Sequence, residues 1–214
     1  MDPSSPAPPR SRAATAVALG LAALVLLFLG TTVYDVVGGG GHDPAQARIE
    51  AFRFERTSVP APAIELEAID GKRFSLADAK GQVVFVNFWA TWCPPCRDEM
   101  PTMIALGKAL AEKHPGKFRM VAVSVDEGWA PVREYLGAPP FFGAERTGLT
   151  VALDPDQKVT QAWYCAARGG TCPDLRFPET YIVDREGKLV SYVVGPRDWS
   201  DPAALAFLES LIGS

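Results

Sequence analysis

Hydrophobic and polar residues alternate with two periodicities along most of the chain, one typical of strands and the other typical of helices. Strand patterns occupy residues 64–76 (around an Asp70-Gly71 turn), 82–90, 118–126, 150–154 and 178–194, the last with a turn at 185–187. Helical spacing occupies residues 94–113, 130–137, 156–165 and 201–212. This alternation predicts an α/β domain of roughly 155 residues, in which helices flank a central mixed β-sheet.

One of these strand-helix junctions carries two cysteines. Residues 82–90 form a nearly continuous apolar run rich in β-branched and aromatic side chains, which is typical of a strand buried on both faces. Pro94 fits the first turn of the following helix, where its missing N–H is not needed. His114-Pro115-Gly116 then ends the helix. Cys93 is therefore expected where a buried strand meets a helix N-terminus.

A run of 22 uncharged residues, 13–34, lies between Arg12 and Asp35. As a helix with a rise of about 1.5 Å per residue it is roughly 33 Å long, enough to cross the hydrocarbon core of a membrane. The run therefore predicts a transmembrane signal-anchor helix over residues 13–35. A cleaved secretory signal is the alternative, but no A-x-A site follows the apolar core.

The residues on either side of this helix predict how the rest of the chain is divided. Residues 1–12 are rich in Pro and Ser and are expected to be a disordered cytoplasmic tail, held inside by Arg10 and Arg12. Residues 36–57 contain four consecutive glycines and are expected to be a flexible linker. The folded domain, residues 58–214, then lies outside the cytoplasm, where disulfides persist.

Composition excludes one broad class of function. The chain of 214 residues has a formal net charge of −4 and contains no run of Lys or Arg within its folded part. A nucleic-acid-binding surface or an anionic-membrane-binding surface requires a basic patch. Nucleic acid is therefore not expected as a partner.

The cysteines carry the candidate chemistry. The chain has four of them: Cys93, Cys96, Cys165 and Cys172. A c-type haem requires C-x-x-C-H, but Arg97 follows the second cysteine. A structural zinc site requires closely spaced ligand pairs, whereas the second cysteine pair is far away and the two histidines, His42 and His114, lie elsewhere. No metal or other cofactor is expected, and thiol-disulfide exchange is the remaining interpretation.

The position of the first pair assigns a role to each sulfur. Free N–H groups and the positive end of the helix dipole stabilise a thiolate at a helix N-terminus, so Cys93 is expected to be the nucleophile. Cys96 lies three residues later on the same helical face and is placed to attack the mixed disulfide and release the partner.

Two blocks of sequence resemble a known family. "VNFWATWCPPCRDEMP" (residues 86–101) and "FPETYIVD" (residues 177–184) resemble the membrane-tethered, extracytoplasmic branch of the thioredoxin superfamily, which includes TlpA, ResA and CcmG (DsbE) proteins. The resemblance covers residues 58–214. It implies a thioredoxin-like fold, thiol-disulfide oxidoreductase activity, and a single-pass protein of the bacterial inner membrane with its domain on the periplasmic side.

The same resemblance implies three substrate-binding residues. Pro178 matches the cis-proline that lies opposite the active site and pairs with an incoming peptide strand, and Phe177 precedes it. Trp92 matches a tryptophan that packs beside the active site. An ordinary trans proline at position 178 and a buried core role for Trp92 are the alternatives.

The resemblance also implies a third catalytic residue. Glu99 matches an acidic residue that this branch keeps in the first turns of the active-site helix. Thioredoxins carry a buried aspartate six residues before the nucleophile, where this chain has Asn87. A general base for Cys96 is therefore expected at Glu99, although a solvated helix residue is the alternative.

Cys165 and Cys172 do not belong to the family pattern. They bracket "AARGGT", a Gly-rich insertion before the Pro178 block. A bridge across about eight residues contributes roughly 2.5 kcal/mol in the chain-entropy model, so a structural disulfide is the preferred interpretation. A second redox pair that exchanges with Cys93, and two free thiols, are the alternatives.

The residues between the active cysteines indicate the direction of electron flow. Pro94 and Pro95 have no backbone N–H, so the amide of Cys96 is the main donor available to the Cys93 sulfur. Fewer donors to the thiolate favour the reducing end of the potential range, and the sequence predicts a reductase. The resemblance then implies a membrane electron donor of the CcdA/DsbD kind and exported disulfide-bearing substrates, with apocytochrome c as one candidate.

Two other classes fit less well. A peroxiredoxin-like peroxidase normally has P-x-x-x-T/S-x-x-C, but Thr91 is two residues before Cys93 and no proline precedes it in the strand. An exported copper chaperone on the same fold requires C-x-x-x-C and a later histidine. Neither spacing is present.

Overall fold

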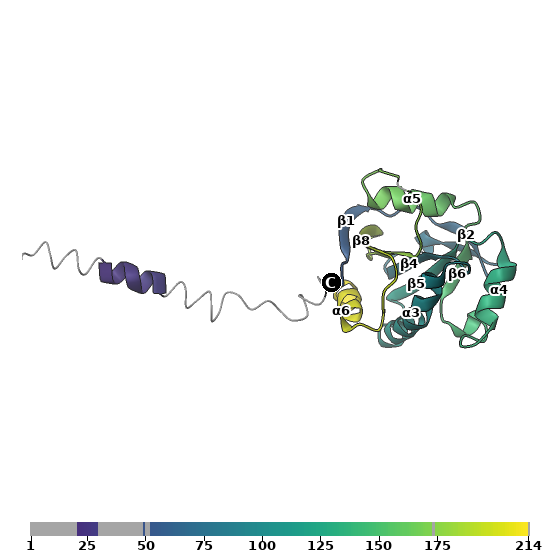
Figure 1. The fold of residues 1–214 in the computed structure, drawn as a ribbon, viewed down its shortest axis with the longest axis horizontal. Helices are drawn as coiled ribbons and strands as arrows, with labels where there is room; N and C mark the ends of the chain where they lie inside the picture. Colours follow the sequence, from purple (N-terminus) through teal and green to yellow (C-terminus); the bar gives the residue numbers. More distant parts are fainter. Residues whose placement is uncertain (1–20, 30–48, 50–51, 173, 214) are drawn as a thin grey trace, which may run out of the picture. The chain divides into compact units, whose positions relative to one another are not determined.

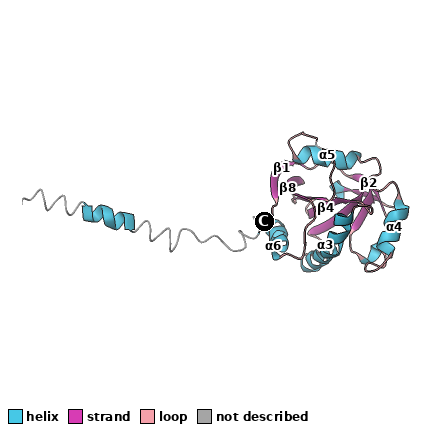
Figure 2. Cartoon of the chain, in the orientation of Figure 1, coloured by secondary structure: helices cyan, strands magenta, loops and turns pink. Residues whose placement is uncertain are grey.

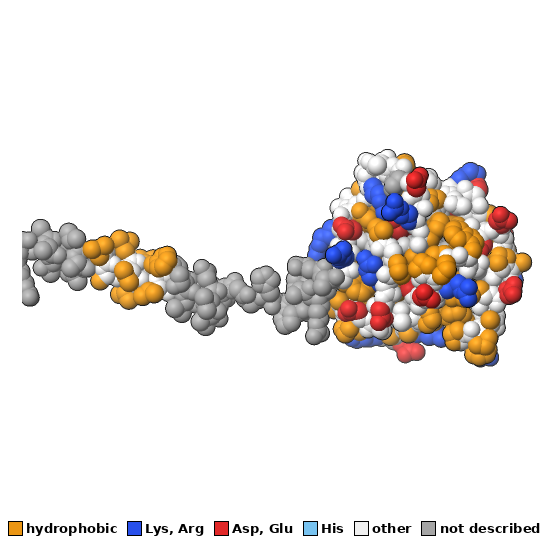
Figure 3. Space-filling view, in the orientation of Figure 1, with side chains coloured by type: hydrophobic (Ala, Val, Ile, Leu, Met, Phe, Trp, Pro, Cys, Tyr) orange, Lys and Arg blue, Asp and Glu red, His pale blue; other side chains and the backbone are white. Residues whose placement is uncertain are grey.

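The computed structural model describes residues 21–29, 49, 52–172 and 174–213, and divides the chain into two compact units, Met1–Pro44 and Ala45–Ser214. In the first unit, residues 21–29 are helical and their large apolar side chains are exposed (Figure 3). Among the described residues, no helix combines the length and apolarity needed to cross a membrane. The rest of the expected span over 13–35 and the tail over 1–12 lie outside the described residues.

The second unit is built on one mixed sheet of eight strands in the order β1-β8-β7-β4-β5-β6-β2-β3 (Figures 1 and 2). The strands are β1 (Glu55–Pro60), β2 (Glu65–Ala68), β3 (Arg73–Ser75), β4 (Val83–Trp89), β5 (Phe118–Ser124), β6 (Thr150–Leu153), β7 (Glu179–Val183) and β8 (Lys188–Val194). Strands β4, β5 and β6 are parallel to one another, whereas the other neighbouring pairs are antiparallel. The expected mixed sheet is therefore confirmed.

Helices cover both faces of this sheet, as Figure 1 shows. They are α3 (Pro94–Lys113), α4 (Trp129–Gly137), α5 (Lys158–Ala167) and α6 (Pro202–Gly213), with short 3-10 turns at η2 (Leu76–Ala79) and η3 (Ala144–Arg146). Buried residues of α3, α4 and α6 share one hydrophobic cluster, and those of α5 belong to the other. The architecture is a three-layer α/β sandwich of the thioredoxin type.

Strand β4 explains why two cores are needed. All seven of its residues are buried, and successive side chains point to opposite faces because a strand has a period of two. Val83 and Phe85 pack in the cluster with α3 and α6, whereas Val84 and Phe88 pack in the cluster with α5. Asn87 therefore faces α3, which places a polar side chain inside an otherwise apolar layer.

The sheet begins before the expected boundary between linker and domain at residue 58. Strand β1 begins at Glu55 and pairs with β8, and Phe52 is buried against Phe54 and Trp199, with ring centroids 4.7 and 5.3 Å apart. The stretch has no apolar run that would indicate a strand, because β1 lies at the sheet edge and is stabilised by its backbone pairing with β8.

Candidate active site

Sheet topology brings the two sequence blocks together. Strand β7 runs antiparallel to β4 with Glu179 opposite Phe88 and Thr180 opposite Asn87. The start of β7 therefore lies at the carboxyl end of β4, where the chain turns toward Cys93. Cys93 and Pro178 thus lie at the same end of the sheet, although they are more than 80 positions apart in sequence.

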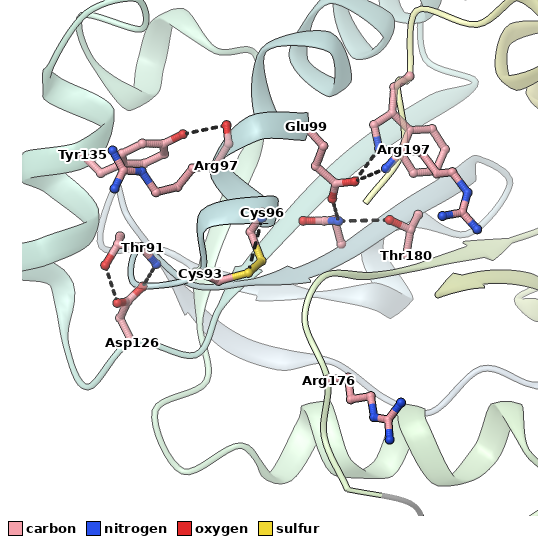
Figure 4. Close-up of a disulfide and its surroundings, with 12 residues drawn as sticks. Thr91, Cys93, Cys96, Arg97, Glu99, Asp126, Tyr135, Arg176, Thr180 and Arg197 are labelled. Atoms are coloured by element: carbon pink, nitrogen blue, oxygen red, sulfur yellow. Dashed lines mark hydrogen bonds between the residues drawn. A yellow bond between two sulfur atoms is a disulfide. The ribbon is translucent and has the colours of Figure 1, made fainter. Parts of the chain in front are cut away.

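The two active-site cysteines form a disulfide at the start of α3, with Cα atoms 5.4 Å apart. Cys93 occupies the N-cap position, and its Sγ accepts a hydrogen bond from the Cys96 N–H at 3.3 Å (Figure 4). An N-cap side chain normally accepts from the second or third helical N–H. Pro95 occupies the second helical position and has no N–H, and Cys96 occupies the third. The expectation that Cys96 supplies the amide is therefore confirmed.

A buried aspartate holds the turn that leads to the nucleophile. Asp126 follows β5, and its carboxylate accepts hydrogen bonds from the Thr91 backbone N–H (3.0 Å) and hydroxyl (2.6 Å). The Ser124 hydroxyl donates to the same carboxylate at 2.6 Å. Sequence reasoning missed Asp126, although a polar residue just past a buried parallel strand is the signal that marks this edge of the sheet.

Glu99 lies on the other side of the disulfide from Asp126 (Figure 4). Its side chain is only 3% exposed, which excludes the solvated-residue alternative. Oε1 accepts from Asn87 Nδ2 at 2.9 Å, and Oε2 accepts from the Arg197 backbone N–H (3.0 Å) and the Trp199 indole (3.1 Å). The Asn87 amide also donates to the Thr180 hydroxyl at 3.0 Å, which links Glu99 to β7.

Burial dominates the ionisation of Glu99. Desolvation raises the pKa of this carboxyl from its ordinary value near 4.5 to about 7, against the opposing effect of its three N–H donors. A hollow of about 320 Å³ between α3 and the segment 196–198 includes Glu99 in its lining. A group with this pKa in a solvent-connected hollow can accept and release a proton near neutral pH.

The expected substrate-binding residues lie side by side. The Phe177–Pro178 peptide bond is cis, as the resemblance implied, so the trans alternative is wrong. The ring of Phe177 meets that of Trp92 edge to face, with centroids 5.8 Å apart. Trp92 is 61% exposed, which rules out a purely core role and leaves an aromatic surface next to Cys93.

The second pair, Cys165 and Cys172, is also a disulfide, with Cα atoms 4.4 Å apart. This pairing excludes the alternative of two free thiols. Among the described residues, no group of three His, Cys, Asp or Glu side chains is arranged to hold a metal ion. His114 Nε2 lies 3.4 Å from Glu209 Oε1, and His42 is outside the described residues.

These features define the class of protein. A C-x-x-C disulfide caps a helix that follows the central strand of a mixed sheet, and a cis-proline segment lies at the same edge. This combination is the active-site arrangement of a thioredoxin-fold thiol-disulfide oxidoreductase.

Comparison with known proteins identifies the family. Residues 56–208 match the Redoxin family, and the chain belongs to it. Thiol-disulfide oxidoreductase ResA of Bacillus subtilis (strain 168) is 31% identical over 176 residues, which cover 82% of each chain. ResA of Geobacillus thermodenitrificans (strain NG80-2) is 32% identical over 150 residues, covering 67% of this chain and 75% of that one.

A solved structure agrees with this assignment. The thiol:disulfide interchange protein of the thioredoxin family from Chlorobium tepidum TLS superposes with a TM-score of 0.57 at 28% identity, covering 73% of this chain and 98% of that chain. The expected thioredoxin-like fold and oxidoreductase class are therefore confirmed.

The buried Glu99 carboxyl predicts a pH-dependent stability. Between pH 4.5 and 7 the native state retains a proton that the unfolded state has lost, so raising the pH favours unfolding. Across this interval, the unfolding free energy of the wild type should fall by about 3 kcal/mol relative to that of Glu99→Gln. Glu99→Gln keeps the side-chain size and an acceptor for the Arg197 and Trp199 donors.

Urea unfolding of the oxidised protein at a series of pH values measures this difference. Glu112→Gln is the matched control, because Glu112 lies on the exposed face of the same helix and should leave the slope unchanged. If the unfolding free energies of the wild type and Glu99→Gln changed in parallel with pH, Glu99 would have the same pKa in the folded and unfolded states, which would contradict the prediction.

Proposed function

We propose that this protein is a membrane-tethered reductase that reduces disulfides of exported proteins through the Cys93-Cys96 dithiol. The observation that carries the proposal is the N-cap geometry of Cys93, whose sulfur accepts one hydrogen bond, from Cys96, within a helix start that contains two prolines. A thiolate with few amide donors is a strong nucleophile and a poor leaving group, which favours transfer of electrons to the substrate.

The proposed reaction has two exchange steps. The Cys93 thiolate attacks one sulfur of the substrate disulfide, and the other substrate sulfur leaves as a thiolate that takes up a proton. Cys96 then loses its proton and attacks the Cys93 sulfur, which releases the second substrate thiol and forms the Cys93-Cys96 disulfide. Two electrons pass from the dithiol to the substrate.

Glu99 is the proposed proton acceptor for Cys96. It lies three residues further along α3, is buried, and has a pKa of about 7, so its carboxylate form is available near neutral pH. Its hydrogen bonds to Asn87 and to the segment that contains Arg197 fix the carboxyl in one position. The hollow beside Glu99 offers a route by which the proton reaches solvent.

The aromatic pair beside the disulfide is the proposed binding surface for the polypeptide substrate. Trp92 and Phe177 expose ring surface next to Cys93, and Pro178 precedes β7 at the sheet edge where the disulfide lies. A substrate segment that lies along residues 176–178 would present its cysteine sulfur to Cys93. Backbone pairing gives such binding little dependence on side-chain identity.

Substitution of each cysteine tests the proposed order of attack. Cys96→Ser should accumulate a covalent mixed disulfide between Cys93 and a protein substrate, because the resolving thiol is absent. Cys93→Ser should form no such adduct and should lose more than 99% of insulin-reducing activity. Non-reducing electrophoresis and mass spectrometry detect the adduct. An adduct on Cys93→Ser, or none on Cys96→Ser, would contradict the assignment.

The reduction potential tests the direction of electron flow. Equilibration of the Cys93-Cys96 couple with glutathione buffers should give a value more negative than about −180 mV. Pro95→Ala restores the second helical N–H and should make the couple more oxidising, because the thiolate gains a donor. Ala162→Gly, at an exposed position of α5, is the matched control and should leave the value unchanged. A wild-type potential above this limit would exclude a reductase.

A reductase outside the cytoplasm must be recharged from the membrane. The run of uncharged residues from 13 to 34 and the basic residues before it support a single-pass anchor in the bacterial inner membrane, with the domain on the periplasmic side. The proposed electron donor is a membrane protein of the CcdA/DsbD kind, and apocytochrome c is a candidate substrate. Tethering raises the effective concentration of the domain near both.

Cell fractionation tests this location. The full chain should remain in the membrane pellet after an alkaline carbonate wash, and protease added to spheroplasts should digest its domain. A chain that starts at Ile49 should be soluble and protected in the cytoplasm. Release of the full chain by carbonate, or a mature N-terminus after residue 30, would instead indicate a cleaved signal.

A further inference from the structure

The second disulfide precedes the cis-proline segment in the chain. Cys165 is in the last turn of α5, and Cys172 is in the loop that leads from this helix toward Phe177. The loop turns back on the helix, with the Gly170 N–H donating to the Cys165 carbonyl at 2.8 Å. Gly169 and Gly170 both have positive φ, +64° and +91°, so the turn depends on residues that do not constrain the backbone.

Arg168, inside this bracketed loop, makes a partly buried ion pair. Its guanidinium donates to Glu179 Oε1 at 2.6 Å and to the Tyr164 carbonyl at 3.1 Å. It also lies over the rings of Tyr164 and Tyr192, at 5.0 Å from each centroid. The Glu179 side chain is 1% exposed, and its other oxygen accepts the Tyr181 hydroxyl at 2.5 Å.

These contacts hold the substrate-binding segment from both sides. Glu179 is the residue directly after Pro178, so the ion pair fixes the C-terminal side of the cis peptide bond. On the N-terminal side, the Tyr164 hydroxyl accepts the Arg176 backbone N–H at 2.9 Å, and its ring lies 6.4 Å from that of Phe177. Every one of these contacts starts on α5 or in the loop that the disulfide closes.

The ion pair needs the loop to be held in place. A buried carboxylate without its partner is strongly destabilising, so any motion of Arg168 away from Glu179 disturbs the start of β7. Residues 169–172 are exposed and contribute no buried apolar side chain that would order the loop. Backbone hydrogen bonds hold the turn after α5, in which the Arg168 and Gly170 N–H groups donate to the Cys165 carbonyl at 3.1 and 2.8 Å. The Cys165-Cys172 bond is the covalent restraint that closes this turn.

We propose that the Cys165-Cys172 disulfide is a positioning element for substrate binding: it holds Arg168 on Glu179 and thereby fixes Phe177 and Pro178 for an incoming peptide. It takes no part in electron transfer, which stays with Cys93 and Cys96. This inference deepens the proposed function and rests on it. Because Cys172 is exposed, an external dithiol can reduce this disulfide while its own two thiols are oxidised to a disulfide. The resulting form binds polypeptides weakly while its active-site dithiol still reacts.

The test compares two thiols as reductants of the oxidised full-length chain. One is a peptide of about ten residues with two cysteines, which must lie along the cis-proline segment. The other is glutathione, which needs only access to the Cys93 sulfur. The two thiols of one peptide, or of two glutathione molecules, are oxidised to a disulfide while the Cys93-Cys96 disulfide is reduced. The reaction therefore does not require Cys165-Cys172 to be reduced first. Tryptophan fluorescence follows the rate.

The double variant Cys165→Ser/Cys172→Ser should raise the KM for the peptide, which is here the concentration that half-saturates this single-turnover reduction, about tenfold, and should leave the limiting rate within about twofold. Its rate with glutathione and its Cys93-Cys96 potential should match the wild type. A parallel loss with both thiols, or a changed potential, would show that the second pair exchanges electrons and would overturn the proposal. An unchanged KM would overturn it as well.

A second variant keeps the test decisive if the serine variant does not fold. Arg168→Met/Glu179→Gln removes both charges of the ion pair and retains the disulfide, and it should raise the peptide KM by a similar factor. Lys158→Met, at the other end of α5, is the matched control and should leave KM unchanged. A wild-type chain that reacts with neither thiol would refute the proposed function itself, whereas normal peptide binding by Arg168→Met/Glu179→Gln refutes only this inference.

Discussion

The antiparallel pairing of β7 with β4 is the constraint on which the active site depends. Strand β4 is fully buried and pairs with β5 on one side and β7 on the other. Because β5 is parallel and β7 antiparallel, the end of β5 and the start of β7 both lie where β4 delivers the chain to Cys93. One register thus brings the nucleophile, the Asp126 turn and the cis-proline segment to the same edge of the sheet.

Three of the buried carboxylates near this edge, Glu99, Asp126 and Glu179, have different partners. Asp126 accepts from the Thr91 and Ser124 groups and holds the turn before the nucleophile. Glu179 is paired with Arg168 and holds the turn after Pro178. Burial raises the pKa of Glu179, although Arg168 opposes this effect. Burial also raises the pKa of Glu99, whose hydrogen-bond donors are neutral N–H groups, to about 7. Two of the three therefore position backbone, and the third is suited to proton transfer.

The helix start that carries Cys93 and Cys96 and the cis-proline segment are held in place by different kinds of contact. The dithiol lies at the start of a 20-residue helix whose inner face is packed in the core. The cis-proline segment is a loop, and its contacts include the Arg168–Glu179 ion pair, the Tyr164 hydroxyl, and a hydrogen bond from the Gly195 N–H to the Pro178 carbonyl at 3.0 Å. The proposed substrate-binding segment therefore depends on contacts that are separate from those that hold the two active-site sulfurs.

Sequence alone determined the features that depend on local pattern. The buried run at residues 82–90, the helix after Cys93 and the hairpin around Asp70-Gly71 follow from periodicity and turn residues, and the structure has each of them. The roles expected for Cys93 and Cys96 follow from their spacing at a helix start and remain predictions. Strand β1 was missed because an edge strand held by backbone pairing needs no apolar pattern.

Only the tertiary structure decided which distant residues meet. Spacing indicates that Glu99 follows Cys96 on a helix, but burial raises its pKa, and hydrogen bonds from Asn87 and Trp199, which lie on β4 and in a distant loop, oppose that rise. Likewise, nothing in the local sequence joins Arg168 to Glu179, because their pairing follows from where α5 packs on the sheet. Burial and strand register set the contacts of Glu99 and of Glu179, and both are properties of the whole fold rather than of any segment.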